Sequence, residues 1–342
     1  GMAMKQAQLV VSPFSVLVGV AIAAGGGNKL PQALPWLVAS SAWFALCLFQ
    51  LFATASKVSE DAQVRAPDAQ AERHGLEKYE HKVGGHTSPD GLDVCLLHHN
   101  QDEVLKRLQP QPYTLRELAF YGREMPEHQE GLLQPVMRYL PQFYGVHDID
   151  SMSYLRLQNL MRQYSKPCIL DVKVGRRCYE VSAPEDKKDR ERQKYPYQET
   201  VGYRVAGLKV WDAERGAFFE EIRQGKNRTE ADMLRGKDVE TYLAGCSSTE
   251  QKLEVTRQLD EHLAKLEQFL AQQTYFEFCA VSLLFAYEGD PQVAPQHRVA
   301  PFVWLVDFAH TIAGCSAVDD NFLFGLRMFR TVMAGVRQRL EH

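Results

Sequence analysis

The amino-acid sequence predicts an α+β protein with two lobes, a small lobe rich in antiparallel strands followed by a larger lobe that mixes strands and helices. Three observations favour this fold class. Short extended segments separated by turn sequences come first, between residues 81 and 109, which is typical of an antiparallel meander. Strand patterns and helix patterns then alternate. The 342 residues are enough to bury the core of one large two-lobed domain.

The N-terminal region differs in composition from the rest of the chain. No charged residue lies between Lys5 and Lys29, nor between Lys29 and Lys57. The second run is close to the roughly 20 apolar residues that span a bilayer, and the first resembles the apolar part of a signal sequence. Residues 1–56 are therefore expected to be an apolar leader, and two interpretations stay open: residues 9–56 anchor the chain in a membrane, or they are a non-functional or weakly packed extension.

A polar linker is expected over residues 57–80, because this stretch offers nothing to bury. The folded domain is then expected over residues 81–342. Its small lobe covers about 81–157 and contains the extended segments "HKVGGH", "LDVCLLHH" and "EVLKRLQ". A helix is predicted over 114–124, with Thr114 as N-cap and Glu117 completing a capping box.

The larger lobe is expected over about 161–342. Extended patterns predict a strand at 153–160, where the small lobe ends, and further strands at 166–175, 202–211, 218–223, 277–289 and 301–310. Helices are predicted at 182–196, 230–243, 249–272 and 320–342. The first of these helices is highly charged, and we expect Ser182 to open it and Pro196 to end it.

Charge and cysteine content narrow the function class. A formal net charge of −4 gives no general attraction to nucleic acid, so a nucleic-acid partner is not expected. The seven cysteines are scattered, with no Cys/His spacing typical of a zinc site. This usage indicates a reducing compartment, and we expect a cytoplasmic or nuclear protein whose membrane contact is confined to the N-terminal segment.

The segment "PCILDVKVG" carries two charges inside an apolar strand pattern. Residues two apart in a strand point to the same face, so Asp171 and Lys173 share one side. The alternate apolar residues point to the other side. One face therefore packs, and the other either performs chemistry or carries an exposed ion pair.

Two further positions suggest nucleotide chemistry. Lys106 lies mid-strand and Glu117 follows on the next helix, an arrangement in which a lysine holds nucleotide phosphates and a carboxylate orients it. The alternative is a solvated lysine and a capping glutamate. Asp307 directly follows an apolar strand, where a carboxylate needs a paired charge or a cation such as Mg²⁺. His310 lies three residues on, and a lone histidine is more often a structural hydrogen-bonding group.

The charged helix places Lys187, Arg190 and Lys194 at i, i+3 and i+7, on one side. Acidic residues balance them, so the helix is either an ordinary solvated one or a binding surface for a polyanionic small molecule. The sequence contains no GxxxxGK[ST], GxGxxG or HRDxxxxN motif. Neither a P-loop NTPase nor an ordinary protein kinase is supported.

Together these segments resemble the inositol polyphosphate kinase family. The signature motif of that family, Pro-x-x-x-Asp-x-Lys-x-Gly, is complete here from Pro167 to Gly175. Other matching segments follow in family order, including "RELAFY", "YPYQETVGYRVAGLKVW", "SLLFAYEG", "VDFAHT" and "DDNFLFGL". The resemblance runs from about His81 to the C-terminus and is greatest to the multikinase branch. It implies a two-lobed, kinase-like fold related to ATP-grasp enzymes, with ATP and Mg²⁺ as cofactors.

The resemblance also implies a role for each candidate residue. On the nucleotide side, Lys106 would bind the ATP phosphates with Glu117 beside it, Asp307 would bind Mg²⁺, and Asp171 would hold the ribose. Backbone groups of Gln158, Asn159 and Leu160 would bind adenine as the hinge. Lys173 would lie between the transferred phosphate and the inositide, and the substrate would face Lys187, Arg190, Lys194 and His310.

The implied activity is phosphoryl transfer to hydroxyls of inositol polyphosphates, with Ins(1,4,5)P3 and InsP4 as acceptors. Two alternatives stay open: a pyrophosphate-forming inositol hexakisphosphate kinase, and a non-catalytic scaffold with this fold. Phosphoinositide lipids also remain open as substrates. Three departures from the family pattern bear on the site: Val281 where a serine is usual, Asn159 where an acidic residue is common, and Arg190 with Glu191 where amides are common.

Overall fold

The computed structural model describes residues 76–83, 95–98, 100–129, 131–149, 152–222 and 228–342. The expected leader and most of the expected linker lie outside these residues. The linker ends earlier than predicted, because β1 (Glu77–Lys78) pairs with β2 (Cys95–Leu97) and so belongs to the folded domain. Among the described helices, none has the length and apolarity that crossing a bilayer requires.

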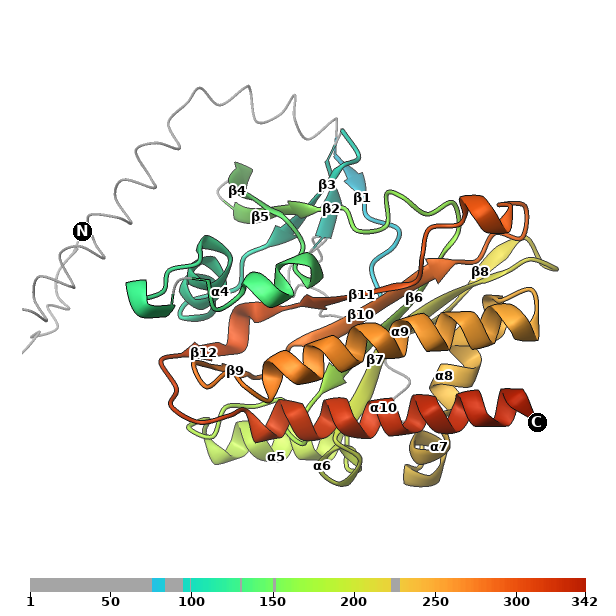
Figure 1. Cartoon of the computed structure of the whole chain (residues 1–342). Coiled ribbons are helices and arrows are strands. Elements are labelled where there is room, and N and C mark those ends of the chain that lie inside the picture. Colours follow the sequence, from blue (N-terminus) through green and yellow to red (C-terminus); the bar gives the residue numbers. More distant parts are fainter. Residues whose placement is uncertain (1–75, 84–94, 99, 130, 150–151, 223–227) are drawn as a thin grey trace, which may run out of the picture. The chain divides into compact units, whose positions relative to one another are not determined.

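The small lobe is built on an antiparallel five-stranded sheet in the order β1-β2-β3-β5-β4 (Figure 1). The bounds of the remaining strands are Glu103–Arg107 for β3, Phe143–Ile149 for β4 and Met152–Gln158 for β5. The meander through β3 agrees with the sequence pattern, whereas β4 was not predicted. Two 3-10 turns, Glu127–Gln129 and Gln134–Tyr139, lead into β4.

Helix α4 (Tyr113–Gly122) follows β3, but not with the predicted cap. It begins after Pro112, and no side chain caps its N-terminus. The Thr114 hydroxyl donates to the main-chain oxygen of Gln109 instead. Glu117 is fully buried and bonds to Lys106, so the predicted capping box is wrong. A charged partner within reach is a stronger attraction for a carboxylate than a free backbone N–H.

The larger lobe is built on a second antiparallel sheet, in the order β11-β10-β6-β7-β8. The strand bounds are Pro167–Val174 for β6, Tyr203–Asp212 for β7, Ala217–Ile222 for β8, Ser282–Glu288 for β10 and Phe302–Val306 for β11. Helices α9 (Thr249–Leu270) and α10 (Asp320–Glu341) lie side by side along this sheet (Figure 1).

The two faces of β6 differ as the alternation predicts. Its core-facing residues join the main hydrophobic cluster with α9 and α10: Cys168, Leu170, Val172 and Val174. The opposite face carries Ile169, which packs in a smaller cluster near the hinge, and then Asp171 and Lys173. The apolar alternation thus directs both charges of the motif away from the main core.

Several predicted elements are shorter or divided. Helix α5 (Glu185–Lys194) begins after Pro184 rather than at Ser182, and α6 (Gln198–Val201) follows it. The helix predicted over 230–243 is broken at Gly236, whose φ of 82° ends α7 (Glu230–Arg235) before α8 (Lys237–Tyr242) and the 3-10 turn Leu243–Gly245.

The strand predicted over 277–289 is divided at Ala280, which has a φ of 57°. Its first part, β9 (Phe276–Phe278), pairs with β12 (Thr311–Ala313) in a separate two-stranded sheet. Its second part is β10. Short 3-10 turns, Pro295–His297 and Phe308–His310, flank β11. This break brings the main chain at Ala280 beside the end of β6, where it contacts Lys173.

The motif glycine has a structural reason to be glycine. Gly175 has a φ of 111°, and a Cβ there would come within 2.6 Å of the Asn321 side chain on α10. On the helix side, a Cβ at Gly325 would lie 2.0 Å from the main-chain oxygen of Gly202. The end of β6 and helix α10 therefore approach each other closely only because side chains are absent at these positions.

Candidate functional site

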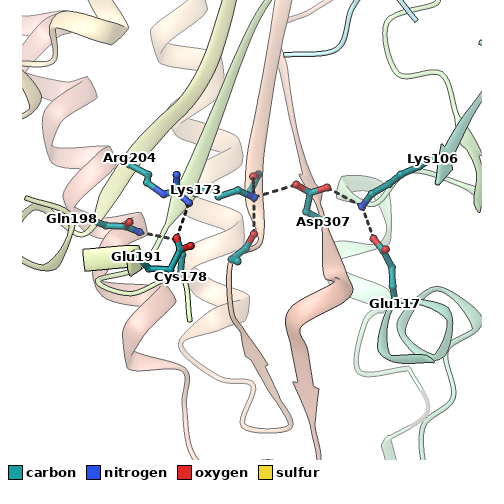
Figure 2. A network of polar contacts seen from close by, with 10 residues as sticks. Lys106, Glu117, Lys173, Cys178, Glu191, Gln198, Arg204 and Asp307 are labelled. Atoms are coloured by element: carbon teal, nitrogen blue, oxygen red, sulfur yellow. Dashed lines mark hydrogen bonds and ion pairs between the residues drawn. The ribbon is translucent and has the colours of Figure 1, made fainter. Parts of the chain in front are cut away.

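The carboxylate of Asp307 joins the two lobes. Asp307 directly follows β11 in the left-handed conformation, with φ 72° and ψ 63°. Its Oδ1 lies 2.9 Å from Nζ of Lys106 on β3, and its Oδ2 lies 3.1 Å from Nζ of Lys173 on β6 (Figure 2). The two lysines lower the pKa of Asp307, against the effect of its burial, so the group is a carboxylate at neutral pH.

Lys106 is held from both sides. Its Nζ donates to Oε1 of Glu117 at 2.6 Å as well as to Asp307. Burial favours the neutral amine, but the two carboxylates outweigh it and raise the pKa of Lys106 well above its usual value. The structure therefore brings the predicted strand lysine and helix carboxylate into direct contact, and the lysine is cationic.

Lys173 lies at the centre of the polar contacts in Figure 2. Besides Asp307, its Nζ donates to the main-chain oxygen of Ala280 at 2.9 Å and to Oγ of Ser282 at 3.1 Å. Against burial, Asp307 and Asp171 raise the pKa of Lys173, so it is also cationic. The serine that contacts the lysine is therefore present, and Val281 packs in the hydrophobic core instead.

Asp171 has an acceptor atom that the protein does not use. The residue is 5% exposed, and its Oδ1 has no hydrogen-bond partner among the described residues. Burial raises the pKa of Asp171 to about 6. A buried carboxyl oxygen without a donor is unfavourable unless a ligand supplies one, so this position fits the ribose-binding role expected for Asp171.

The expected hinge follows β5. Asn159 is buried, and its main-chain N–H donates to the main-chain oxygen of Asp102 at 2.8 Å. That main-chain N–H is therefore already bonded within the protein, and the expectation that backbone groups of Gln158, Asn159 and Leu160 bind adenine stays a prediction. Within the described part of the chain, the main-chain N–H of Leu160 has no acceptor. Leu160 is thus the hinge residue best placed to donate to a base, and Gln158 ends β5 with an exposed side chain.

A second group of polar side chains forms where α4, α5 and the turn after Asp307 meet. Lys187 donates to the hydroxyl of Tyr113 at 3.2 Å, and the rings of Tyr113 and His310 are 4.3 Å apart. His310 Nδ1 lies 3.4 Å from Oε1 of Glu180, which also accepts a bond of 2.6 Å from Arg116. Burial lowers the pKa of His310, so its imidazole is neutral at neutral pH.

The predicted basic face of the charged helix is only partly formed. Lys187 contacts Tyr113 and is half-buried, but Arg190 is exposed and pairs with Asp186 at 3.0 Å. Lys194 donates to Glu191 at 2.7 Å. Among the interactions of the described residues, none joins Arg190 to Tyr113 or His310, and its side chain is exposed. The expectation that Arg190 faces the same ligand as Lys187 stays a prediction, and the structure shows only that, of these two, Lys187 alone contacts Tyr113.

Two arginines near the site were not predicted. Arg116 reaches Glu180 beside His310, and its position one turn after Tyr113 on α4 was the available sequence signal. Arg204 is directly opposite Lys173 in the pairing of β6 with β7. Its guanidinium lies 3.7 Å from the ring centre of Tyr195, and its Nε has no partner among the described residues. Only the register of the two strands reveals this proximity.

The residues present fit a magnesium-nucleotide complex. In the described residues, no three His, Cys, Asp or Glu side chains gather as a metal cluster. Mg²⁺ commonly takes only one or two carboxylates and completes its shell with water and phosphate oxygens. The ionised carboxylate of Asp307, between two lysines that attract phosphates, offers this kind of donor set.

A two-lobed, kinase-like fold with a lysine-carboxylate centre defines the class of protein. A sequence profile described as inositol polyphosphate kinase matches residues 154–334, more than half of the chain. The chain belongs to the inositol polyphosphate kinase family, which confirms the predicted family.

Individual relatives agree with this assignment. Inositol polyphosphate multikinase from Homo sapiens is 31% identical over 225 residues, which cover 64% of this chain and 53% of that protein. The chain therefore spans about half the length of the human relative. Inositol polyphosphate multikinase alpha from Arabidopsis thaliana is 29% identical over 283 residues, 73% of this chain and 92% of the relative. Inositol hexakisphosphate kinase 3 from Mus musculus is 24% identical over 205 residues, 54% of this chain and 51% of the relative.

A solved structure shares the fold. The inositol phosphate multikinase of S. cerevisiae, crystallised with ADP and Mn²⁺, aligns with a TM-score of 0.57 at 22% identity. The alignment covers 69% of this chain and 99% of the yeast chain. The predicted fold class is confirmed.

Proposed function

We propose that this protein transfers the γ-phosphoryl group of ATP to hydroxyls of inositol polyphosphates, with Ins(1,4,5)P3 and InsP4 as acceptors. The observation that carries the proposal is the carboxylate of Asp307 held between Lys106 and Lys173. Relatives named inositol polyphosphate multikinase, and a related structure that contains ADP and Mn²⁺, support it.

The nucleotide would use groups that the protein already orients. Lys106, fixed by Glu117, would bind ATP phosphates, and Asp307 would hold Mg²⁺. When bound, the metal supplies positive charge to the phosphate oxygens. Asp171 would accept a hydrogen bond from a ribose hydroxyl through its unused Oδ1, and the main chain near Gln158 and Leu160 would contact the base.

The acceptor would bind on the side of Lys187 and His310. Phosphate groups of the inositide would contact Lys187 and Lys194, together with Arg116 and Arg204, which complement a polyanion. Exposed Arg190 would contribute at most long-range attraction. Lys173 would lie between ATP and the inositide, where the negatively charged phosphoryl group is transferred from one to the other.

The reaction requires positioning and charge more than a reactive side chain. The acceptor hydroxyl oxygen forms a bond to the γ-phosphorus, the bond from that phosphorus to the ADP oxygen breaks, and the hydroxyl proton is released late. Lys173 stabilises charge on the transferred group. The neutral imidazole of His310 can accept a proton, whereas the cationic Lys173 cannot. His310 is therefore better placed than Lys173 to assist release of the hydroxyl proton.

A phosphoinositide headgroup is a second acceptor that one observation favours. Leu115 and Val181 are 59% and 64% exposed, and they adjoin Arg116 and Glu180 in sequence. Of the two, only Leu115 adjoins a basic residue, and Glu180 beside Val181 accepts a bond from that same Arg116. Exposed aliphatic side chains near an arginine suit a site that works at a lipid surface. Residues 9–56 would be the only other membrane contact, and a cytoplasmic or nuclear location remains part of the proposal.

The test is to supply the purified protein with ATP, Mg²⁺ and one acceptor at a time, and to separate products by phosphate number. The acceptors are Ins(1,4,5)P3, InsP6 and vesicles containing PtdIns(4,5)P2. Formation of tetrakis- and pentakisphosphates supports the proposal, whereas turnover of InsP6 alone assigns the protein to the pyrophosphate-forming branch. Consumption of ATP with none of these acceptors phosphorylated would contradict the proposed function. Phosphorylation of PtdIns(4,5)P2 in the vesicles decides separately whether a lipid is an acceptor.

A further inference from the structure

The side chain of Asn159 bonds to three residues around the hinge. Its Nδ2 donates to the main-chain oxygen of Gln101 at 2.7 Å. Its Oδ1 accepts a bond of 3.0 Å from the hydroxyl of Tyr79 and one of 3.2 Å from the main-chain N–H of Met161. Its own N–H donates to Asp102. Both amide atoms are therefore occupied by the protein, and the orientation of the side chain is fixed.

Tyr79 belongs to a strap, residues 79–83, that links the small lobe to the sheet of the larger one. Directly after β1, the main-chain oxygen of Glu80 accepts a bond of 2.6 Å from Lys209 on β7. Val83 packs in the cluster that contains Leu160, and Tyr79 packs against the same cluster. The strap thus lies against the hinge, although about 80 residues separate the two in sequence.

The Tyr79 hydroxyl can act only as a donor toward Asn159. Burial raises the pKa of Tyr79, so the hydroxyl stays protonated across the physiological range. Asn159 Oδ1 receives this bond and the bond from Met161, so the hinge turn is held at Asn159 and again two residues later. Leu160, whose N–H has no acceptor among the described residues, lies between these two points.

We propose that Tyr79 and Asn159 form a positioning pair that holds the Leu160 main chain in place for the adenine base, so that the strap sets the affinity for the nucleotide. This inference rests on the proposed function in taking ATP as the donor. Neither residue contacts Lys106, Lys173 or Asp307 among the interactions of the described residues. The pair therefore acts on the base and not on the phosphates.

The pair also gives a reason for asparagine at this position. An aspartate would still accept the bonds from Tyr79 and Met161, but it would place an oxygen opposite the main-chain oxygen of Gln101, where Nδ2 now donates. Two acceptors in contact without a proton between them repel each other. Asn159→Asp therefore tests the same pair by removing the bond from the Asn159 side chain to Gln101.

Two probes separate the base from the phosphates. Calorimetry on the full chain compares the affinity for Mg²⁺·ATP with that for Mg²⁺·tripolyphosphate, which has no adenine. For Tyr79→Phe we expect affinity for ATP to fall about three- to ten-fold, the effect of one hydrogen bond, with tripolyphosphate binding unchanged. Kinetically, KM for ATP rises by the same factor while kcat stays within about twofold.

The matched control is Tyr164→Phe, which removes a hydroxyl from the same hydrophobic cluster but one that bonds to Ala300 at 3.4 Å. It should leave both affinities unchanged. A Tyr79→Phe variant with unchanged affinity for ATP, or with equal losses for both probes, overturns the inference. Should Tyr79→Phe not fold, Asn159→Asp decides by the same criteria.

Direct binding keeps this inference distinct from the proposed function. A wild-type protein that binds Mg²⁺·ATP but phosphorylates no inositide contradicts the proposed function, and the effect of the variants on ATP affinity still decides the positioning pair. A wild-type protein that binds tripolyphosphate as tightly as ATP overturns the pair directly, because the base would then contribute nothing for the hinge to position.

Discussion

Oδ2 of Asp307 lies 3.1 Å from Nζ of Lys173, although 134 residues separate them in the chain. The same carboxylate contacts Lys106 through its other oxygen. One carboxylate therefore pairs with two cations that come from different sheets, and Glu117 beside Lys106 supplies a second negative charge, so the site depends on Asp307 for both charge and geometry.

Replacing Asp307 with asparagine should abolish turnover and also weaken the fold. The amide cannot neutralise the two lysines, so two poorly solvated cations face each other, and a metal loses its carboxylate ligand. We expect a loss of at least about a thousand-fold in kcat/KM and of about 1–3 kcal/mol in the free energy of unfolding. Steady-state kinetics and urea unfolding measure the two effects. Activity within tenfold of wild type would contradict the assigned role.

Lys187 and Arg190 provide a matched pair on one helix. Lys187→Gln should raise KM for the inositide about tenfold, because its ammonium lies beside Tyr113 and His310 on the acceptor side. Arg190→Gln should change it by less than about twofold, since Arg190 is exposed and paired with Asp186. Both variants keep the KM for ATP. Equal effects of the two substitutions would show that the whole basic face binds the acceptor.

Asp171 links stability to pH. Its folded pKa of about 6 is raised above the ordinary value of 3.8 by burial, so the folded protein keeps a proton that the unfolded chain has already lost. Stability therefore falls as pH rises from about 4 to about 6, and stays lower above that window. Asp171→Asn should remove this fall and stabilise the protein at pH 7 by up to about 3 kcal/mol, while weakening ATP binding.

Urea unfolding at several pH values between 4 and 8 measures this difference, with calorimetry for ATP. The variant and wild type should be nearly equal in stability at pH 4, and the variant should be the more stable at pH 7. A variant that is less stable than wild type at pH 7 would contradict the assignment of Asp171 as a buried, under-bonded carboxyl.

Two glycines of α10 test the close packing of this helix against the end of β6, where the motif glycine Gly175 lies. Gly325→Ala should destabilise the protein by about 2–4 kcal/mol, since its Cβ would lie 2.0 Å from one main-chain oxygen and 2.4 Å from the nitrogen of Gly175. Gly335→Ala, on the same helix, meets only Arg339 at 3.7 Å and should stabilise it by up to about 1 kcal/mol. Thermal or urea unfolding of both variants checks the contrast; a tolerated alanine at Gly325 would be inconsistent with the packing described.

Local patterns predicted what depends on neighbours in sequence. The alternation along β6 put Asp171 and Lys173 on one face, and the apolar run before Asp307 placed that carboxylate at a strand end. The contact of Lys106 with Glu117 spans only 11 residues and joins adjacent elements. The placement of Asp171, Lys173 and Asp307 follows from strand period and burial alone, whereas the contact of Lys106 with Glu117 competed with the capping role that the same spacing predicts for Glu117.

What the sequence did not predict depends on register and on distant contacts. Arg204 lies opposite Lys173 because β7 pairs with β6 in one register, and a shift of one residue would turn it to the other face. Arg190 and Lys187 look equivalent by spacing, yet only the packing of Tyr113 on one side distinguishes them. The contact of Tyr79 with Asn159 joins segments about 80 residues apart, which no local pattern encodes.

The most direct test of the proposed transfer follows the γ-phosphate itself. Wild type and Lys173→Met are each mixed with Mg²⁺, γ-³²P-labelled ATP and Ins(1,4,5)P3, and label in the inositide is counted over time, with ADP binding measured alongside. We expect label in InsP4 for wild type, a loss of at least about a hundred-fold for the variant, and ADP affinity retained in both. Label transfer by Lys173→Met at the wild-type rate, or none by wild type under any acceptor condition, would contradict the proposed transfer.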